Sequence, residues 1–238
     1  MGEAIEVGVI GGSGIYELAP VVEVLGGVTV CEVEGGQVAF LNRHGSGHVL
    51  PPHAVDYRGN LRALHDLGVR TVFATFACGS LRAELGPGTM VVPDQLIDRT
   101  RARADTYFDR FDDGPAHAAF ADPYDAGARR VLLDAAPEAV DGGTVVVIEG
   151  PRFATRAESR WYGSMGASLI NMTQYPEAVL ARELGIAYAA IGLVTDHDAG
   201  LDDRPDVAPV TQEAAFAEFA LHLPRLREVV LRAVSAVV

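Results

Sequence analysis

The sequence contains no lysine: all 19 basic residues among its 238 are arginines. Schiff-base chemistry on a lysine amine is therefore excluded. Asp and Glu number 32, which gives a formal net charge of −13. A nucleic-acid-binding surface needs a cluster of basic residues, so this balance argues against nucleic acid as a partner. A small anion can still bind where a few arginines and backbone N–H groups converge.

Cysteine is almost as scarce as lysine. The two cysteines, Cys31 and Cys78, are far apart in apolar surroundings and do not make a disulfide framework. No group of Cys and His residues has the spacing of a zinc site, so no zinc site of this kind is expected.

Long apolar runs, targeting signals and repeats are also missing. No apolar run has the length of a membrane span. The N-terminal residues MGEAIEVGVIGG contain neither the basic segment nor the cleavage site of a signal peptide. We therefore expect a cytoplasmic protein without a membrane partner. Without a linker or repeat, residues 1–238 are predicted to form a single domain.

What the sequence does contain is a regular alternation of strand-like and helix-like segments, with 49% apolar residues to fill a core. The predicted strands are residues 6–10, 28–31, 38–42, 71–75, 89–92, 144–149, 169–171 and 188–194. The predicted helices are residues 57–67, 126–135, 157–165, 176–184 and 211–236. This order predicts an α/β fold with a mixed, mainly parallel sheet flanked by helices. Binding sites in such sheets lie at the carboxyl ends of the strands.

Two of the early strands end in residues that could hold an anion. Gly11-Gly12-Ser13-Gly14 follows the first, where glycines allow backbone N–H groups to approach an anion and Ser13 adds a hydroxyl. A tight structural turn explains this segment equally well. Arg43 and His44 follow the third predicted strand, and arginine is a natural ligand for an oxyanion. A solvated Arg43 and a loop His44 are the ordinary alternative.

Small and apolar residues end three more strands. The segment TFACGS after residue 74 would let a ligand approach the backbone, or would permit close helix packing. Phe153 could stack on a flat base or simply belong to the core. The run Asn171-Met172-Thr173 offers small and polar groups at another strand end.

The last predicted strand runs directly into Thr195-Asp196-His197-Asp198. In an extended chain, the side chains of Asp196 and Asp198 would point to the same side. Two carboxylates there could hold a metal, share a proton, or accept hydrogen bonds from an amino group and a ring N–H. Such a pair in a surface loop is usually solvated, but the strongly apolar strand before it favours a functional role.

Taken together, these segments closely resemble the methylthioadenosine phosphorylase branch of the purine nucleoside phosphorylase family. The matching strings occur in the family's order over roughly residues 7–200: GVIGGSGIY, RHG with PPHAVDYRGNLRAL, ACGS, PGTMVVPDQLIDRT, IEGPRFATRAES, INMTQYPEAVLARE and VTDHDAG. The resemblance implies phosphorolysis of S-methyl-5′-thioadenosine or a related 5′-deoxyadenosine, with inorganic phosphate as co-substrate and no metal or organic cofactor.

The resemblance also assigns roles to individual residues. The phosphate site would comprise Ser13, Arg43, His44, the backbone N–H of Ala77, and Thr173. Phe153 and Met172 would line the ribose and base, with Asp196 near purine N7 and Asp198 near the 6-amino group. Burial beside Asp198 would raise the pKa of Asp196, so that Asp196 can protonate the leaving base. His117 matches a residue that reaches the 5′ pocket of a neighbouring subunit, which implies a homo-oligomer, by analogy a trimer.

Two departures from the family pattern bear on the substrate. Phe76 stands where some relatives have a threonine that contributes to the phosphate site. The sequence also stops soon after its last predicted helix, whereas relatives often continue with a segment that closes the 5′ pocket.

Three alternatives stay open. A nucleoside hydrolase on the same fold would use water in place of phosphate. A phosphorylase for 6-oxopurine nucleosides would differ in the base, although the family places an asparagine at position 198 for that purpose. A nucleoside-binding protein without catalysis would need a damaged catalytic set, whereas Arg43, His44, Asp196 and Asp198 are all present.

Overall fold

The computed structural model describes residues 5–112, 114–201 and 206–238. Within these ranges eleven strands join in one sheet. The strands are β1 (Val7–Gly11), β2 (Val21–Leu25), β3 (Val28–Val33), β4 (Gly36–Asn42), β5 (Thr71–Ser80), β6 (Met90–Val92), β7 (Gln95–Arg99), β8 (Val140–Asp141), β9 (Thr144–Ile148), β10 (Leu169–Asn171) and β11 (Ala187–Asp196). The helices are α1 (Tyr57–Asp66), α2 (Ala126–Ala135), α3 (Arg156–Ser164), α4 (Gln174–Glu183) and α5 (Gln212–Ser235), with a short 3-10 helix at Pro52–Ala54.

The sheet is built around β5, and its order is β2-β3-β4-β1-β5-β10-β9-β7. On the other side of β5 lies β11, which continues to β6 and β8. The pairs β1/β4, β1/β5, β5/β11 and β9/β10 are parallel, whereas the β2-β3-β4 meander and the β5/β10 pair are antiparallel. This arrangement confirms the predicted mixed, mainly parallel sheet.

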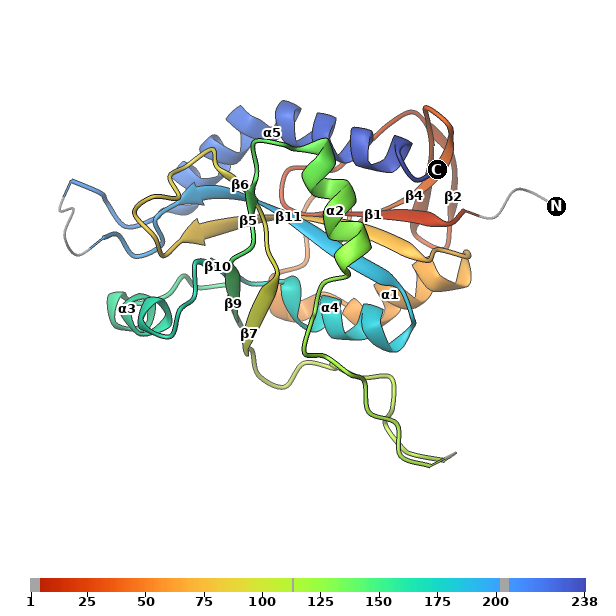
Figure 1. Cartoon of the computed structure of the whole chain (residues 1–238), viewed down its shortest axis with the longest axis horizontal. Coiled ribbons are helices and arrows are strands. Elements are labelled where there is room, and N and C mark those ends of the chain that lie inside the picture. Colours follow the sequence, from red (N-terminus) through yellow and green to blue (C-terminus); the bar gives the residue numbers. More distant parts are fainter. Residues whose placement is uncertain (1–4, 113, 202–205) are drawn as a thin grey trace.

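Helices cover both faces of the sheet. Figure 1 shows α5 and α2 on one face and α1 and α4 on the other. Each pair closes its own apolar core: Leu132 and Val229 belong to the first, and Leu61 and Leu180 to the second. The apolar faces of these helices pack on the sheet and exclude water from both of its faces. α3 lies beyond β9 and β10, near the end of the sheet where the parallel strands have their carboxyl ends (Figure 1).

All five predicted helices are confirmed to within a few residues. Three strands were missing from the sequence prediction: β2, β7 and β8. β2 is exposed at every residue, β7 has a mixed polar sequence, and β8 has two residues. Each of the three is an edge strand that pairs with one neighbour. An edge strand can form without a buried, alternating apolar pattern, and none of the three has such a pattern.

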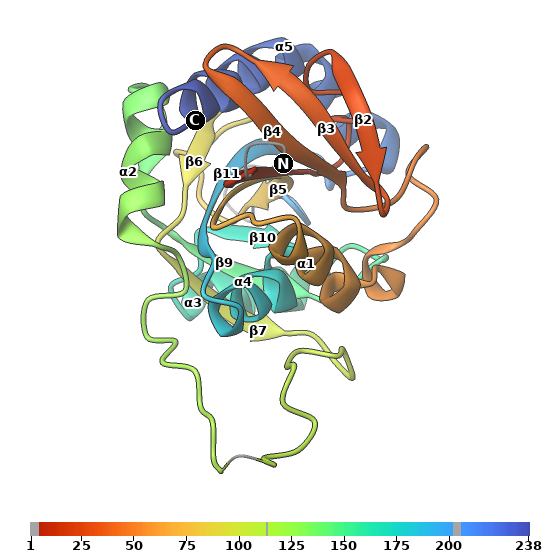
Figure 2. The same cartoon turned by 90° about the vertical axis from the view of Figure 1, so that its right-hand side faces the viewer.

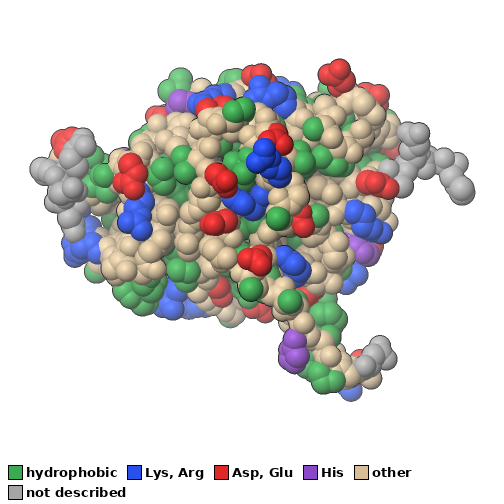
Figure 3. All heavy atoms as spheres, viewed as in Figure 1, with side chains coloured by type: hydrophobic (Ala, Val, Ile, Leu, Met, Phe, Trp, Pro, Cys, Tyr) green, Lys and Arg blue, Asp and Glu red, His purple; other side chains and the backbone are tan. Residues whose placement is uncertain are grey.

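The segment between β7 and α2 leaves the body of the molecule and returns, as Figure 2 shows. Its base is attached by polar contacts: Tyr175 Oη donates to Asp105 at 2.7 Å, and the backbone N–H of Tyr107 donates to Glu183 at 2.6 Å. Arg58 adds a two-bond ion pair with Asp109. The segment is therefore anchored at its base while its outer part extends into solvent (Figure 3).

On the face shown in Figure 3, arginine side chains lie among aspartates and glutamates rather than in one basic patch. Among the helices of the described ranges, none is long and apolar enough to cross a membrane.

Candidate active site

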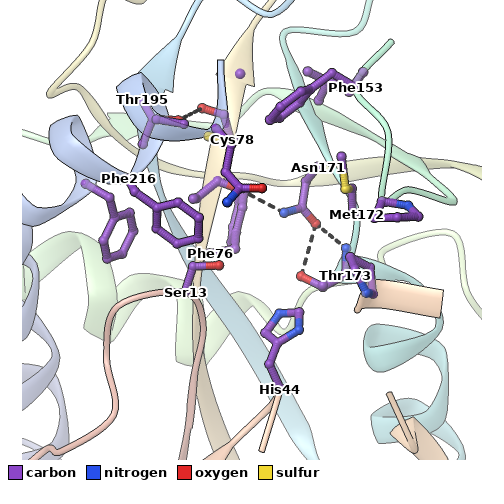
Figure 4. A pocket seen from close by; sticks show the side chains of 18 of the residues that line it. Ser13, His44, Phe76, Cys78, Phe153, Asn171, Met172, Thr173, Thr195 and Phe216 are labelled. Atoms are coloured by element: carbon purple, nitrogen blue, oxygen red, sulfur yellow. Dashed lines mark hydrogen bonds between the residues drawn. The ribbon is translucent and has the colours of Figure 1, made fainter. Parts of the chain in front are cut away.

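A cavity of about 450 Å³ opens beside β5 at the carboxyl end of the sheet (Figure 4). Its lining combines nine of the ten site residues predicted from the sequence with residues from α5 and the loop after β4. The nine are Ser13, Arg43, His44, Ala77, Phe153, Met172, Thr173, Asp196 and Asp198.

The cavity lies where one edge of β5 has no neighbouring strand. Pairing with β1 ends at Ala74, and pairing with β10 begins at Gly79. In between, the carbonyl of Thr75 accepts from Arg43 Nη1 at 2.8 Å, and that of Ala77 accepts from Asn171 Nδ2 at 2.9 Å. Because the N–H and C=O of a strand residue point to the same edge, the N–H of Ala77 also faces this gap. The fold thus presents a backbone donor where the sequence predicted one.

Arg43 closes the bottom of the cavity and is only 1% exposed. The alternative of a solvated arginine is therefore wrong. Its Nε and Nη2 atoms donate to the two carboxylate oxygens of Glu177 at 2.6 Å each. Burial by itself would lower the pKa of Arg43, but the charge and hydrogen bonds of Glu177 raise it above its ordinary value, so the guanidinium stays charged.

His44 is buried next to Arg43, not a loop side chain in solvent. Its Nδ1 lies 2.8 Å from the carbonyl of Leu50, which can only accept, so Nδ1 carries the hydrogen. Burial, aided by the charge of Arg43, lowers the pKa of His44 to about 4. At neutral pH its Nε2 is therefore an unprotonated acceptor. The ring of His48 stacks on His44 at a centroid distance of 4.3 Å.

Thr173 stands at the start of α4, where backbone N–H groups point out of the helix. Asn171 Oδ1 accepts from the backbone N–H groups of Thr173 and Gln174 at 2.6 and 2.9 Å. Figure 4 shows the contact between Asn171 and Thr173, with Ser13, His44 and Thr173 gathered at one end of the cavity. This end therefore combines the hydroxyl groups of Ser13 and Thr173 and the N–H of Ala77 with one charged guanidinium.

Asp196 and Asp198 lie at the other end. The predicted extended geometry is wrong: β11 ends at Asp196, and Asp198 has a φ of 46°. The chain turns because Asp196 Oδ1 accepts from the backbone N–H of Asp198 at 2.7 Å. A side chain at Gly79 would clash with this turn, since its Cβ would lie 2.8 Å from Asp196 Oδ1. Both carboxylates nevertheless line the cavity.

The two carboxyl groups have different surroundings. Asp198 is 2% exposed, and its Oδ2 has no hydrogen-bond partner among the described residues. Burial raises the pKa of Asp198 to about 6, a hydrogen bond from Ser159 opposes this, and the charge of Asp196 adds to it. Burial also raises the pKa of Asp196, against hydrogen bonds from Thr195 Oγ1 and the Asp198 N–H. The predicted rise in the pKa of Asp196 is therefore found, with burial as its main cause.

Apolar side chains connect the two ends. Phe153 is 39% exposed and faces the cavity, so it is not a core residue; Met172 lies beside it (Figure 4). Phe76 is buried, and its ring occupies the space above Gly192, where an added Cβ would lie 2.6 Å away. Its side chain contributes surface but no donor to the phosphate end.

Several lining residues were missing from the sequence prediction. Phe216, Phe219 and Gln212 come from α5, and His48 and Val49 from the loop after β4. The helix residues have ordinary amphipathic spacing, which gives no sign of a site. His48 lies four residues after His44 within the matching region, and that proximity was the available signal.

The tenth predicted residue, His117, is not part of the cavity. It lies on the protruding segment and contacts the ring of Phe111 at 5.4 Å. Within one chain it reaches no other predicted site residue, and its proposed approach to a neighbouring subunit stays a prediction. No group of three or more metal-ligating side chains occurs in the part of the chain that the structure describes.

A mixed, mainly parallel sheet with a cavity at its strand ends, a charged donor cluster at one side of that cavity and two carboxyls at the other, is typical of an α/β enzyme with a small substrate. The chain belongs to the phosphorylase superfamily, whose model matches residues 6–238.

Its relatives carry more than one name. The chain is 53% identical to S-methyl-5′-thioadenosine phosphorylase of Mycolicibacterium smegmatis, over 97% of this chain and 90% of the relative. It is 48% identical to purine nucleoside phosphorylase of Streptomyces coelicolor, over 97% and 89%. Among solved structures, methylthioadenosine phosphorylase from Schistosoma mansoni in complex with adenine matches with a TM-score of 0.87 and 34% identity, covering 98% of this chain and 92% of that one.

Proposed function

We propose that this enzyme cleaves S-methyl-5′-thioadenosine with inorganic phosphate, releasing adenine and 5-methylthioribose 1-phosphate. The observation that carries this proposal is that one cavity joins two complementary ends. The Arg43 end suits an anion, and the Asp198 end has a buried acceptor that no described residue satisfies. A purine nucleoside bound between them would place its glycosidic bond near the phosphate.

The phosphate would bind at the Arg43 end. Ser13, Thr173 and the N–H of Ala77 are neutral donors there, and Arg43 supplies the charge. Charge-assisted hydrogen bonds of this kind are the stronger ones. The unprotonated Nε2 of His44 would accept a hydrogen bond from the O–H of hydrogen phosphate, which orients the anion so that an unprotonated oxygen faces the nucleoside.

The base would bind at the other end, between Phe153 and the two aspartates. Asp198 Oδ2 would accept from the 6-amino group, which gives this buried oxygen its missing partner. Asp196 would lie near N7 and protonate or hydrogen-bond the purine as it leaves, and its raised pKa suits that role.

The reaction follows from the bond that breaks. Departure of the base leaves an oxocarbenium-like ribosyl cation, as in glycoside hydrolysis. The phosphate anion beside it stabilises that charge and then forms the new bond to C1′. Proton transfer from Asp196 keeps the departing purine from accumulating negative charge. No step requires a metal or an organic cofactor.

The 5′ substituent would meet an apolar wall. Phe216, Phe219 and Val49 line this part of the cavity. A thioether loses little on leaving water for such a surface, whereas a hydroxyl without a partner pays a desolvation cost. The M. smegmatis relative bears the corresponding name. In the assembly we propose a homotrimer in the cytoplasm, in which His117 of each subunit approaches the cavity of a neighbour.

Product analysis tests the proposal. Purified enzyme is incubated with S-methyl-5′-thioadenosine in buffer with and without inorganic phosphate, and adenine and pentose products are quantified. We expect adenine release only with phosphate, together with a phosphorylated pentose. Equal release of adenine and free pentose without phosphate would identify a hydrolase instead.

The S. coelicolor relative is named a purine nucleoside phosphorylase, a name that does not restrict the 6-substituent of the base, so 6-oxopurine nucleosides are the second candidate. Inosine and guanosine therefore belong in the same assay. A faster reaction with inosine than with the methylthio substrate would replace the first proposal by the second.

A further inference from the structure

The ion pair between Arg43 and Glu177 is the most completely buried charged contact of the cavity floor. Arg43 is 1% exposed and Glu177 0%. Its two hydrogen bonds, each 2.6 Å long, connect the strand end after β4 with α4. A buried pair of this kind contributes little net stability, because desolvation of both ions offsets their attraction. Its position under the anion end of the cavity suggests a role in binding.

The pair with Glu177 leaves some N–H groups of Arg43 available for a ligand. A guanidinium has five N–H groups in a rigid plane. Glu177 takes one from Nε and one from Nη2, and the carbonyl of Thr75 takes one from Nη1. One N–H on Nη1 and one on Nη2 remain, and Arg43 lines the cavity. Since the plane is rigid, the acceptors that hold three of its donors also set the direction of the other two.

Glu177 is itself held in place. Tyr188 of β11 donates its hydroxyl hydrogen to Glu177 Oε1 at 2.6 Å. The backbone after β1 packs closely against the guanidinium, since a Cβ added at Gly12 would lie 3.0 Å from Nη1 and glycine leaves room for Arg43 there. The arginine therefore sits between a strand backbone and a fixed carboxylate.

We propose that Glu177 is a positioning residue for phosphate: it fixes the Arg43 plane so that two N–H groups face the anion site. Tyr188 supports Glu177 in this role. The proposal rests on the proposed function, since it takes phosphate as the anion at this end. Glu177 touches neither phosphate nor nucleoside. Its effect on the reaction passes through the direction of two hydrogen bonds.

The test is Glu177→Gln, which keeps the shape of the side chain but turns one acceptor into a donor. That donor would face an N–H of Arg43, so the plane can no longer be held in the same direction. We expect the KM for inorganic phosphate to rise about tenfold or more, the equivalent of one charge-assisted hydrogen bond. The KM for the nucleoside and the Kd for adenine should stay within about threefold of wild type, since neither ligand depends on the direction of those N–H groups.

Glu183→Gln is the matched control, because it makes the same change in the same helix. Glu183 accepts from Thr106 and Tyr107 at the base of the protruding segment and does not line the cavity. Its phosphate KM should equal that of wild type. Equal phosphate KM values for folded Glu177→Gln and wild type would overturn the proposal. So would equal losses of phosphate and adenine affinity, which would indicate a general structural role.

Tyr188→Phe serves if Glu177→Gln does not fold, as judged by circular dichroism. It removes the bond to Oε1 and leaves the ion pair intact, so the phosphate KM should rise about two- to fivefold. An unchanged phosphate KM in this variant overturns the proposal in that case. Titration of wild type with inorganic phosphate distinguishes failure of the Glu177 proposal from failure of the proposed function. A wild type that binds no phosphate contradicts the proposed function itself.

Discussion

The backbone N–H of Asp198 donates a 2.7 Å hydrogen bond to Oδ1 of Asp196. The two carboxyl groups are therefore joined by a turn of the main chain and do not project from one face of a strand. The turn uses Oδ1 of the first carboxyl, whereas Oδ2 of the second is buried without a hydrogen-bond partner among the described residues. Two chemically identical side chains thus have different surroundings.

The first prediction concerns the choice of base. Asp198→Asn replaces the acceptor that would face the 6-amino group with an amide that can donate. We expect kcat/KM for the methylthio substrate to fall by roughly 10- to 150-fold, which corresponds to about 1.5–3 kcal/mol for a hydrogen bond to a charged group. Activity on inosine should change less, so the preference narrows or reverses. Competition assays with both nucleosides measure this, and a wild type that prefers inosine would show that Asp198 has another role.

The second prediction concerns pH. Burial, with the charge of Asp196, raises the pKa of Asp198 to about 6, above that of the unfolded chain. The ionised acceptor form is thus lost as the pH falls through about 6, and kcat/KM for the methylthio substrate should decrease there. His44 stays neutral over this range because burial and the charge of Arg43 lower its pKa to about 4.

The same shift predicts the sign of a stability change. The folded state binds a proton on Asp198 more readily than the unfolded state, so wild type should gain stability relative to Asp198→Asn as the pH falls from 7 to 5. Thermal unfolding of both proteins at each pH provides the measurement. A constant difference between them would contradict the raised pKa.

The third prediction separates the structural from the functional part of the Arg43 pair. Arg43→Ala leaves Glu177 charged and buried without its partner, which should cost about 3–5 kcal/mol of stability. The double variant Arg43→Met with Glu177→Leu removes both charges and should recover most of that loss. Neither variant should use phosphate efficiently. Urea unfolding and phosphate kinetics test the two statements, and a double variant with normal phosphate KM would remove Arg43 from the anion site.

The fourth prediction concerns the departing purine. Asp196→Asn keeps the acceptor for the Asp198 N–H but cannot supply an acidic proton. We expect kcat to fall by about 10²–10⁴-fold, the usual contribution of a general acid. The phosphate KM should change little, because Asp196 lies at the opposite end of the cavity from Arg43. A drop in kcat below tenfold would assign the proton to another group.

The fifth prediction concerns assembly. If His117 approaches the cavity of a neighbouring subunit, light scattering should report a mass near three times 25.2 kDa. His117→Ala should alter discrimination between 5′-thioether and 5′-hydroxyl nucleosides more than it alters base preference. Phe111→Ala, which removes the ring that His117 contacts within the chain, separates a local effect from a contact between subunits. A fully active monomer at assay concentration would contradict the shared site.

The sequence by itself determined the elements and the order of the motifs. Apolar segments of the right length predicted all five helices, and small residues at strand ends marked the carboxyl edge where the cavity lies. The sequence pattern indicated Arg43, Thr173 and Asp198 as candidate site residues because each lies just after such a strand. Nothing in the sequence pattern indicated Phe216, since an aromatic residue on an amphipathic helix has the same spacing whether it faces a core or a cavity.

Only the tertiary structure decided how the groups of the site are paired. Arg43 and Glu177 are 134 residues apart, and no local pattern links them. Their contact exists because the end of β4 and the start of α4, which follows β10, meet at the carboxyl edge of one sheet. The stretch of β5 that lacks a neighbouring strand on one edge has the same kind of origin, because β1 stops pairing at Ala74 and β10 begins pairing at Gly79. Local sequence sets propensity and periodicity, whereas burial, ion pairing and free strand edges depend on which distant segments meet.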